Sequence, residues 1–240
     1  GSTTQESAAS QAQQDEPEEE GDKAPQETIV EAVLNEEQLL ACCEQLKKAP
    51  AIAVSLETDG AHYMEASIIG VAVAVQAGAA FYIPVAHDSL EFPTQLDRQL
   101  VMNSLKPILE DATIKKIGQN IKYDLTVLRN HGIELQGVAF DTMLESYMNN
   151  STAHRHDLNT LAETYCSHSM IPFSEVAGKG KKQITFGQVE LDKATDYAAE
   201  DADYTLRVHQ ALMPQLQEKP GPLDLFTTLE MPLLQVLADV

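Results

Sequence analysis

Three apolar segments in the first part of the chain have the composition of β-strands. The first, AIAVSLET, ends in polar residues, and the second, ASIIGVAVAV, is long and rich in β-branched residues. Short turn signals that contain Gly60 and Gly78 separate the three segments, a spacing that indicates a meander of hairpins. We therefore predict strands over residues 51–58, 66–75 and 79–85, with two further short strands at 115–118 and 138–140.

Most of the remaining chain has helical periodicity, with apolar residues three and four positions apart. This pattern predicts helices over 36–48, 95–110, 120–131, 141–149, 156–167 and 187–217. Gly132 follows one of them and is a suitable C-cap. A last helix, predicted from Leu223, reaches Val240 without a stop signal, so we expect the native chain to continue. Strands followed by helices favour an α/β domain with a mixed central β-sheet flanked by helices.

Residues 1–28 are rich in Gln, Glu, Ser and Ala and have no apolar periodicity. Such a segment buries too little apolar surface to fold, so we predict a disordered acidic linker. Gly1 and Ser2 are interpreted as the remnant of a removed tag. The chain therefore divides into this linker, one folded domain at 29–222 and the truncated start of a further helix at 223–240.

The formal net charge of −21 argues against a general nucleic-acid binder, because such proteins carry a basic footprint. Two explanations stay open: a protein that avoids nucleic acid, or one whose acids gather divalent metal ions and which touches DNA over a small patch. Cys42, Cys43 and Cys166 lack metal-ligand spacing and indicate idle thiols in a reducing, cytosolic compartment. Long apolar runs such as 66–75 are too short to span a bilayer, so no membrane partner is expected.

Three acidic residues have positions that suit metal-dependent hydrolysis. Cleavage of a phosphodiester by two divalent metal ions needs about four carboxylates that converge from rigid elements. Glu57 lies at the polar end of the first strand, two residues after Ser55, so both side chains point to one face. Asp124 lies in GQNIKYD, and Asp201 follows Tyr197 by one helical turn. Each signal alone is weak, because an acid on a helix is usually a solvated surface residue.

The order and wording of several longer motifs are more specific. They are YIPVAHD (82–88), KPILED (106–111), GQNIKYD (118–124), FDTMLESY (140–147), RHDLNTLAE (155–163), AGKGKKQITF (177–186), YAAEDADYTL (197–206) and EMPLL (230–234). With these motifs the chain resembles the 3′→5′ proofreading exonuclease domain of bacterial DNA polymerase I, over about residues 28–240. That family belongs to the Tyr-containing branch of the DEDD superfamily. The resemblance implies a ribonuclease H-like fold.

The resemblance also implies an active site. Glu57, Asp124 and Asp201 match the family's metal-binding acids, and Tyr197 matches the tyrosine that helps to orient the attacking water. The leading aspartate of the first motif, which bridges two metal ions in the family, is replaced by Ser55. We expect Mg²⁺ as the physiological ion, with Mn²⁺ as a substitute. Because a neutral hydroxyl does not bridge two hard cations as a carboxylate does, we expect a weakened two-metal site and reduced or lost activity.

Candidate DNA contacts come from the same comparison and from charge. The resemblance places Arg155 against the DNA strand and Phe173 near the bound 3′ end, although Phe173 as a core residue is an equal alternative. The lysines of AGKGKKQITF either contact phosphate or lie on a solvated loop. Gln119 and Asn120 either bind substrate or support the second motif. The DNA-binding candidates are therefore Gln119, Asn120, Arg155, Phe173, Lys179, Lys181 and Lys182.

Two neighbouring histidines, His154 and His156, have the wrong spacing for facing metal ligands. Asp157, which follows them, is instead predicted to cap the next helix. Tyr123 is predicted to be a core residue.

Three functions are weighed. The first is removal of nucleotides from a single-stranded or frayed 3′ end of DNA, for proofreading in replication and repair. The second is a catalytically inactive structural or DNA-binding module of the polymerase, an alternative raised by Ser55. The third is a free-standing RNA exonuclease of the ribonuclease D type, against which 82–88, 177–186 and the unfinished helix at 230–234 argue. We expect a monomeric domain joined to a polymerase in one native chain, in the bacterial cytoplasm at the nucleoid.

Overall fold

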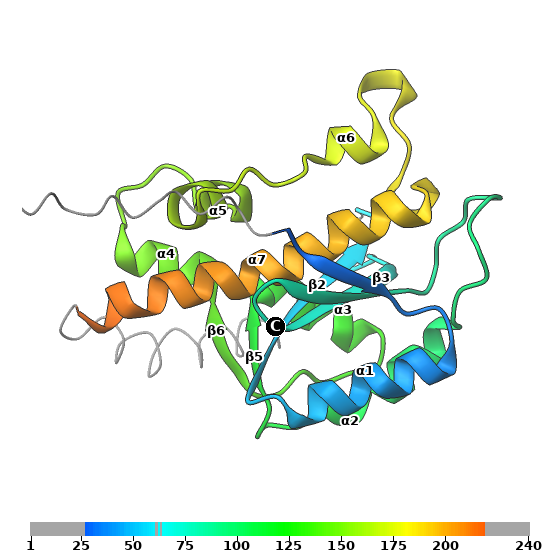
Figure 1. Cartoon of the computed structure of the whole chain (residues 1–240), viewed down its shortest axis with the longest axis horizontal. Coiled ribbons are helices and arrows are strands. Elements are labelled where there is room, and N and C mark those ends of the chain that lie inside the picture. Colours follow the sequence, from blue (N-terminus) through cyan, green and yellow to red (C-terminus); the bar gives the residue numbers. More distant parts are fainter. Residues whose placement is uncertain (1–26, 61, 63, 219–240) are drawn as a thin grey trace, which may run out of the picture.

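The computed structural model describes residues 27–60, 62 and 64–218, which form a six-stranded mixed sheet with helices on both faces (Figure 1). The strand order is β1-β4-β3-β2-β5-β6. Strands β2, β3 and β4 form the predicted antiparallel meander, whereas β1 joins β4, and β5 and β6 join β2, in parallel. The strands are β1 (Ile29–Ala32), β2 (Ala51–Thr58), β3 (Ile68–Gln76), β4 (Ala79–Pro84), β5 (Lys115–Gly118) and β6 (Val138–Asp141).

The helices form layers above and below this sheet. Helices α1, α2 and α3 pack on one face, and α7 crosses the other (Figure 1). Helix α5 packs on the side of α7 away from the sheet, so α7 is covered on both sides. The α-helices are α1 (Glu36–Lys48), α2 (Arg98–Leu109), α3 (Ile121–Asn130), α4 (Thr142–Asn149), α5 (Leu158–Cys166), α6 (Phe173–Ala177) and α7 (Leu191–Gln217), with 3₁₀ turns η1 (Gly180–Lys182) and η2 (Phe186–Gln188).

Helix α7 lies against the sheet because its inner surface is made of small residues. Ala194, Ala198, Ala199 and Ala202 are fully buried in one apolar cluster with residues of the central strands. Small side chains allow a helix and a sheet to pack tightly without voids. The helix is thereby fixed with respect to β2, the strand that carries the first acidic motif.

The structure confirms the predicted α/β class and most elements, and it changes some boundaries. The predicted helix at 187–217 begins at Leu191, because η2 is closed by a capping box at Thr185 and the chain is extended at Val189 and Glu190. Helix α6, which the sequence did not predict, lies between Pro172 and Gly178. The linker predicted at 1–28, apart from its last two residues, and the helix predicted from Leu223 lie outside the described residues.

The cysteines and the apolar segments bear on disulfide formation and on membrane-spanning helices. Cys42 and Cys43 are buried, Cys166 is half-buried, and all three are free. In the part of the chain that the structure describes, no helix is long and apolar enough to cross a membrane.

Candidate active site

Strand β2 presents Ser55 and Glu57 to the face that α7 covers. Val54 and Leu56 are buried in the cluster under α1 to α3, whereas Ala53 is buried against α7. Because side chains alternate along a strand, Ser55 and Glu57 share the face of Ala53. The first motif is therefore held by a rigid, buried strand at the centre of the sheet.

Asp124 contacts β2 where β5 no longer pairs with that strand. Strand β5 pairs with β2 only along residues 51–53, so the remaining edge of β2 faces α3. There the backbone N–H of Leu56 donates a hydrogen bond to the Asp124 carboxylate. Tyr123 packs on the core, as predicted, and its hydroxyl lies 2.9 Å from the Thr58 hydroxyl oxygen. Two contacts thus fix the start of α3 to the end of β2.

Asp141, at the end of β6, holds the other side of this helix start. Its carboxylate accepts the backbone N–H groups of Asn120 at 3.1 Å and Ile121 at 2.8 Å, and that of Met143 at 2.8 Å. Asn120 has a left-handed backbone with φ of 53°. Asp141 therefore satisfies the exposed donors of two helix N-termini at once. Sequence reasoning gave Asp141 no role, because two of its partners, Asn120 and Ile121, lie 21 and 20 residues away in the chain.

Asp201 completes the acidic group from α7. Asp201 and Glu57 share a hydrogen bond, and Oε1 of Glu57 is buried without a hydrogen-bond partner among the described residues. Burial raises the pKa of Glu57 far above its ordinary value, and the charges of Asp201 and Asp124 raise it further. Burial also raises the pKa of Asp124, helped by Asp141 and Asp201. For Asp201, burial raises the pKa to about 6, although the hydrogen bond from Glu57 lowers it.

The arrangement has the charge and chemistry of a cation site. Asp124 is buried and Glu57 and Asp201 are half-buried, and their charges disfavour one another. Oε1 of Glu57 lacks a hydrogen-bond partner among the described residues, which a hard divalent cation would supply. Even so, no three His, Cys, Asp or Glu side chains within residues 27–60, 62 and 64–218 form a metal-binding group. Ser55 has no carboxylate, and Glu57 and Asp201 are joined to each other by a hydrogen bond.

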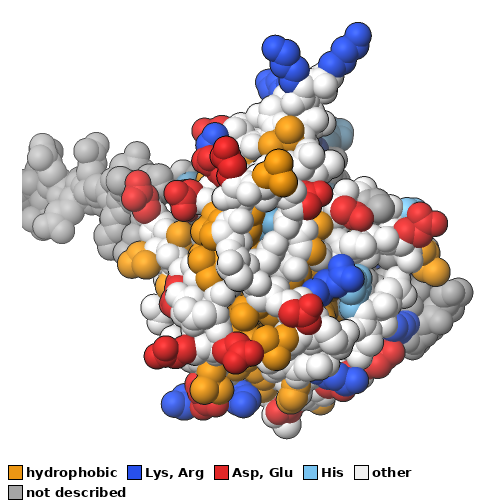
Figure 2. All heavy atoms as spheres, turned by 90° about the vertical axis from the view of Figure 1, so that its right-hand side faces the viewer, with side chains coloured by type: hydrophobic (Ala, Val, Ile, Leu, Met, Phe, Trp, Pro, Cys, Tyr) orange, Lys and Arg blue, Asp and Glu red, His pale blue; other side chains and the backbone are white. Residues whose placement is uncertain are grey.

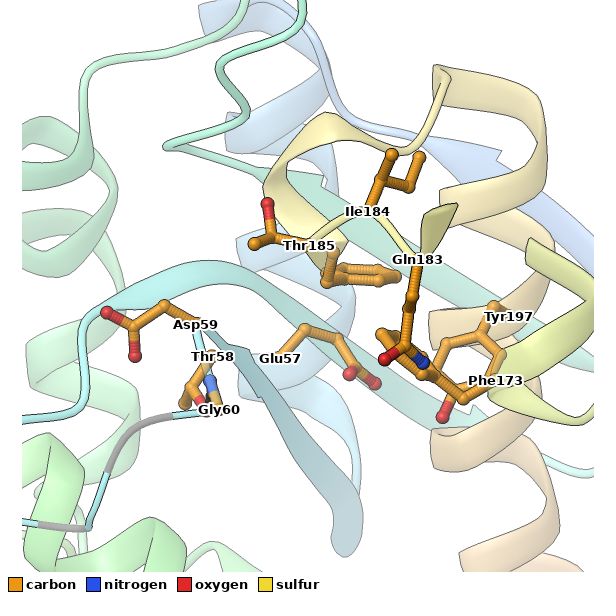
Figure 3. A pocket seen from close by; sticks show the side chains of 10 residues that line it. Glu57, Thr58, Asp59, Gly60, Phe173, Gln183, Ile184, Thr185 and Tyr197 are labelled. Atoms are coloured by element: carbon orange, nitrogen blue, oxygen red, sulfur yellow. Dashed lines mark hydrogen bonds between the residues drawn. The ribbon is translucent and has the colours of Figure 1, made fainter. Parts of the chain in front are cut away.

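A cavity of about 330 Å³ opens beside Glu57, whereas Asp124 and Asp201 do not line it (Figure 3). One wall is the end of β2 and the other is the segment from α6 to η2. In Figure 3, Glu57, Tyr197 and Gln183 point toward the same space, and Phe173 lies beside Tyr197. The lining residues are Glu57, Thr58, Asp59, Gly60, Phe173, Gln183, Ile184, Thr185, Phe186 and Tyr197.

Tyr197 and Phe173 form an aromatic edge to this cavity. Their ring centroids are 6.0 Å apart in an edge-on arrangement, and Phe186 lies 5.7 Å from Tyr197 on the other side. Burial raises the pKa of Tyr197, and the charges of Asp201 and Glu57 raise it further, so its hydroxyl keeps its proton at neutral pH. Phe173 is 36% exposed, so it is not a core residue.

Asp59 does not take the place of the missing aspartate. It lines the cavity, but its carboxylate accepts the backbone N–H of Ser67 at 3.3 Å. In Figure 3 the Asp59 side chain points away from Glu57. The closest acid along the strand is thus committed to the turn that follows β2.

The predicted DNA contacts fall into separate groups. The Gln119 amide donates to the carbonyl of His156 at 2.8 Å and accepts from the hydroxyl of Thr142, which favours its supporting role. Arg155 is 73% exposed and pairs with Asp157 at 3.0 Å. Asp157 caps α5, as predicted. Asn120 is exposed at the start of α3.

The three lysines lie on a segment that stands out from the body of the domain. Lys179, Lys181 and Lys182 are exposed in and beside η1. Figure 1 shows the α6–η1 segment projecting beyond α7, and Figure 2 shows basic side chains at the tip of a projection above an apolar hollow. The basic patch therefore lies next to Gln183 and Ile184, which line the cavity.

The YIPVAHD motif has a structural explanation. Gly70 pairs with Glu57 across the sheet, and a Cβ on Gly70 would lie 2.1 Å from the Tyr82 hydroxyl. The absent side chain therefore makes room for Tyr82, whose hydroxyl lies 2.7 Å from Nε2 of His87. Burial lowers the pKa of His87 to about 4. This pair fills the sheet face behind Glu57 and was not foreseen.

The buried groups predict opposing effects of pH on the metal-free protein. Asp201 takes up a proton near pH 6 when folded and near 3.8 when unfolded, so acidification through this window favours the folded state. His87 takes up a proton near pH 4 when folded and 6.5 when unfolded, so acidification favours the unfolded state. Without the Asp201 carboxyl, the destabilisation caused by protonation of His87 should therefore lack the opposing effect of Asp201 protonation.

We expect the Asp201→Asn variant to lose more stability than the parent protein between pH 7 and pH 4.5, by on the order of 1–3 kcal/mol. Urea unfolding in EDTA at both pH values measures the difference. Equal losses for the two proteins would show that Asp201 does not titrate in this window.

Comparison with known proteins agrees with this geometry. A family model described as 3′-5′ exonuclease matches residues 30–217. DNA polymerase I of Pseudomonas aeruginosa is 46% identical over 228 residues, which cover 92% of this chain and 25% of that protein. The chain therefore spans about a quarter of the length of this curated relative.

Solved structures show the same fold. RNase D of Trypanosoma brucei superposes with a TM-score of 0.69 at 16% identity, covering 87% of this chain and 72% of the other. NrnC of Brucella melitensis with bound Mg²⁺ superposes with a TM-score of 0.60 at 17% identity, covering 88% and 90%. The fold is thus ribonuclease H-like, as predicted. By the match to its family model, the chain belongs to the 3′-5′ exonuclease domain family of DNA polymerase I.

Proposed function

We propose that this domain hydrolyses the 3′-terminal phosphodiester bond of DNA, and that the site at the end of β2 performs the reaction. The observation that carries the proposal is the convergence of Glu57, Asp124 and Asp201 from a strand and two helices beside an open cavity. Acids from separate rigid elements are costly to bring together without a ligand, because each raises the pKa of its neighbours. Such a cost is typical of a functional site.

Glu57 and Asp201 would hold one divalent cation, and Asp124 would support a second. Both members of the first pair are half-buried and share a hydrogen bond, and Oε1 of Glu57, which has no hydrogen-bond partner among the described residues, is a ready ligand. When bound, the cations would stabilise negative charge on the attacking and leaving oxygens. Mg²⁺ suits an all-oxygen site, and Mn²⁺ is a substitute; the NrnC structure with bound Mg²⁺ supports this choice.

Tyr197 would orient the attacking water. Its protonated hydroxyl faces the cavity one helical turn before Asp201, and the flanking rings of Phe173 and Phe186 limit its movement. A fixed phenol can donate one hydrogen bond and accept another. Glu57, on the opposite side of the cavity, would accept a hydrogen bond from the same water.

Ser55 weakens this machinery in the proposed mechanism. A hydroxyl carries no charge with which to bridge two cations, and the hydrogen bond between Glu57 and Asp201 supports a weakened site. We infer low activity for the chain as it stands. The second candidate function, a silent DNA-holding module of the polymerase, rests on this substitution and on the missing metal-binding group in the described part of the chain.

The cavity suits a single-stranded 3′ end. Phe173 and Ile184 are exposed apolar side chains at its wall, where an unpaired base can stack. Mismatched ends cost less to unpair, so they would enter more readily, as proofreading in replication and repair requires. The Pseudomonas relative, of which this chain covers a quarter, supports a native chain that also carries a polymerase. We propose that this chain works as a monomer in the bacterial cytoplasm at the nucleoid.

The lysine segment predicts the salt dependence of DNA binding. Changing Lys179, Lys181 and Lys182 together to alanine should weaken binding of single-stranded DNA and reduce the slope of log K against log salt by roughly 2, since each phosphate contact contributes about 0.7. Fluorescence anisotropy between 50 and 200 mM salt measures both, on the scale over which counterion release is seen. An unchanged slope would show that the segment does not face DNA.

The direction of digestion tests the function itself. A 5′-labelled single-stranded oligonucleotide, incubated with a high concentration of the protein and Mg²⁺, should shorten stepwise from its 3′ end and release nucleoside 5′-monophosphates. A blunt duplex of the same sequence should react more slowly, and Glu57→Gln should remove the residual activity. Digestion from the 5′ end, or digestion that survives EDTA, would rule the proposal out.

A further inference from the structure

The connection between α5 and α6 runs alongside α7 toward α6, which carries Phe173 at the edge of the cavity (Figure 1). One buried acid of α7 holds it. The backbone N–H of Ile171 donates to Oε1 of Glu200 at 2.6 Å, and Nε2 of His168 lies 3.3 Å from Oε2 of the same carboxylate. The His168 ring also stacks on Tyr204, with centroids 4.0 Å apart and planes 10° apart. Two residues of the connection are therefore fixed to two residues of one helix.

Glu200 is only 9% exposed and precedes Asp201 in the chain. The two neighbours have different partners: Asp201 bonds to Glu57 on β2, while Glu200 bonds to the connection. A single turn of α7 thus sets both the acidic group and the path of the segment opposite it. On the α5 side, Asn159 accepts the backbone N–H of Met170 at 3.0 Å, so the next residue, Ile171, is the one whose N–H is bound by Glu200.

Only Pro172 separates Ile171 from Phe173, the aromatic residue at the edge of the cavity. Ile171 packs on the apolar cluster under α7, and Phe173 meets Tyr197 at 6.0 Å. Because proline fixes its own φ, the position of Ile171 is passed to Phe173 with little freedom. Loss of the Glu200 contact would leave the partly buried N–H of Ile171 without this partner, which favours a displaced connection.

We propose that Glu200, supported by His168, is a positioning residue that holds Phe173 over the cavity and thereby sets the affinity for the 3′-terminal nucleotide. The inference rests on the proposed function, because it assumes that the cavity receives this nucleotide. Glu200 acts through Phe173 and does not touch the substrate.

The test uses a single-stranded oligonucleotide with 2-aminopurine at its 3′ end, whose fluorescence falls when the base stacks. In Mg²⁺, Glu200→Ala should weaken binding by about tenfold, the scale of one lost buried hydrogen bond. Glu200→Gln should bind within about twofold of the parent protein, because its amide oxygen still accepts the Ile171 N–H. Asp192→Ala, on the exposed side of the same helix, is the matched control and should change nothing.

A double-mutant cycle separates positioning from general damage. In a Phe173→Ala background, Glu200→Ala should add less than about twofold, since the residue it positions is gone. In the Ser55→Asp background, which supplies turnover, Glu200→Ala should raise KM by about tenfold and leave kcat within about twofold. Additive effects in the cycle, an equal loss in kcat, or no rescue by glutamine would overturn the proposal.

His168→Ala covers the case in which Glu200→Ala does not fold. The variant keeps the hydrogen bond from Ile171 to Glu200 and removes only the contact between His168 and the Glu200 carboxylate. We therefore expect about threefold weaker binding of the oligonucleotide, and a smaller effect in the Phe173→Ala background. Full affinity in His168→Ala would contradict the support assigned to it. If the parent protein binds the oligonucleotide but Glu200 variants bind equally well, only this inference fails. If the parent protein does not bind at all, the proposed function fails with it.

Discussion

Ser55→Asp is expected to raise the rate of Mg²⁺-dependent 3′→5′ digestion of single-stranded DNA by on the order of 10³-fold. The substitution returns a carboxylate to the strand face that already carries Glu57. Ala72, which pairs with Ser55 across the sheet, has a small side chain, and Ser55 itself is half-buried. A bridging carboxylate contributes several kcal/mol to stabilising charge in the transition state, which corresponds to this factor.

Two controls accompany this substitution. Ser55→Asn has the size of aspartate without its charge and should stay as slow as the parent protein. Ser55→Asp combined with Asp124→Ala should lose the gain, which excludes a contaminating nuclease. Rapid digestion by the parent protein would refute the assigned defect at Ser55. If the Ser55→Asp variant binds metal but stays inactive, the result would favour the second candidate function, an inactive structural or DNA-binding module.

The second large effect concerns metal binding by Asp201. Saturating Mn²⁺ at about 100 times its Kd should stabilise the parent protein by about 2.7 kcal/mol, or roughly 5–10 °C in Tm for a domain of this size. Asp201→Asn should abolish this shift, because it removes one ligand and leaves Glu57 alone on its side of the cavity. In EDTA the same variant should be at least as stable as the parent at neutral pH, since one buried negative charge is gone.

Calorimetric titration measures the binding of Mn²⁺, and thermal unfolding with and without the ion measures the shift in Tm. Asp192→Asn, an exposed acid on the same helix, should behave as the parent protein. Identical titrations for the parent and Asp201→Asn would contradict the shared site.

The fold was predictable because its signals are local. The β-branched residues of β2 and β3 predict strands, and the alanine-rich pattern of α7 predicts a helix. Neither prediction needs knowledge of contacts between residues far apart in the chain. Helix α6 escaped prediction because it has five residues and stands between Pro172 and Gly178, where propensity carries little information. Helix α7 begins later than predicted because η2 and its capping box precede it. Hydrophobic periodicity does not locate a helix boundary to within a few residues.

The candidate site was predictable only in part. Glu57, Asp124 and Asp201 were selected through the family resemblance, and the structure brings them together; their catalytic role remains a prediction. Asp141 and Glu200 escaped because their partners lie 20 and 29 residues away, and no spacing rule links such positions. Gln183 and Ile184 line the cavity only because η1 and η2 turn the chain back toward β2.

The number of metal ions bound per chain tests the central claim most directly. Equilibrium dialysis against Mn²⁺, with the bound ion counted by electron paramagnetic resonance, reports this number without any need for activity. We expect one weakly bound ion in the parent protein, none in Asp201→Asn, and two in Ser55→Asp. Two ions already bound to the parent protein, or no ion gained by Ser55→Asp, would contradict the assignment of Ser55 as the missing bridge between cations held by Glu57, Asp124 and Asp201.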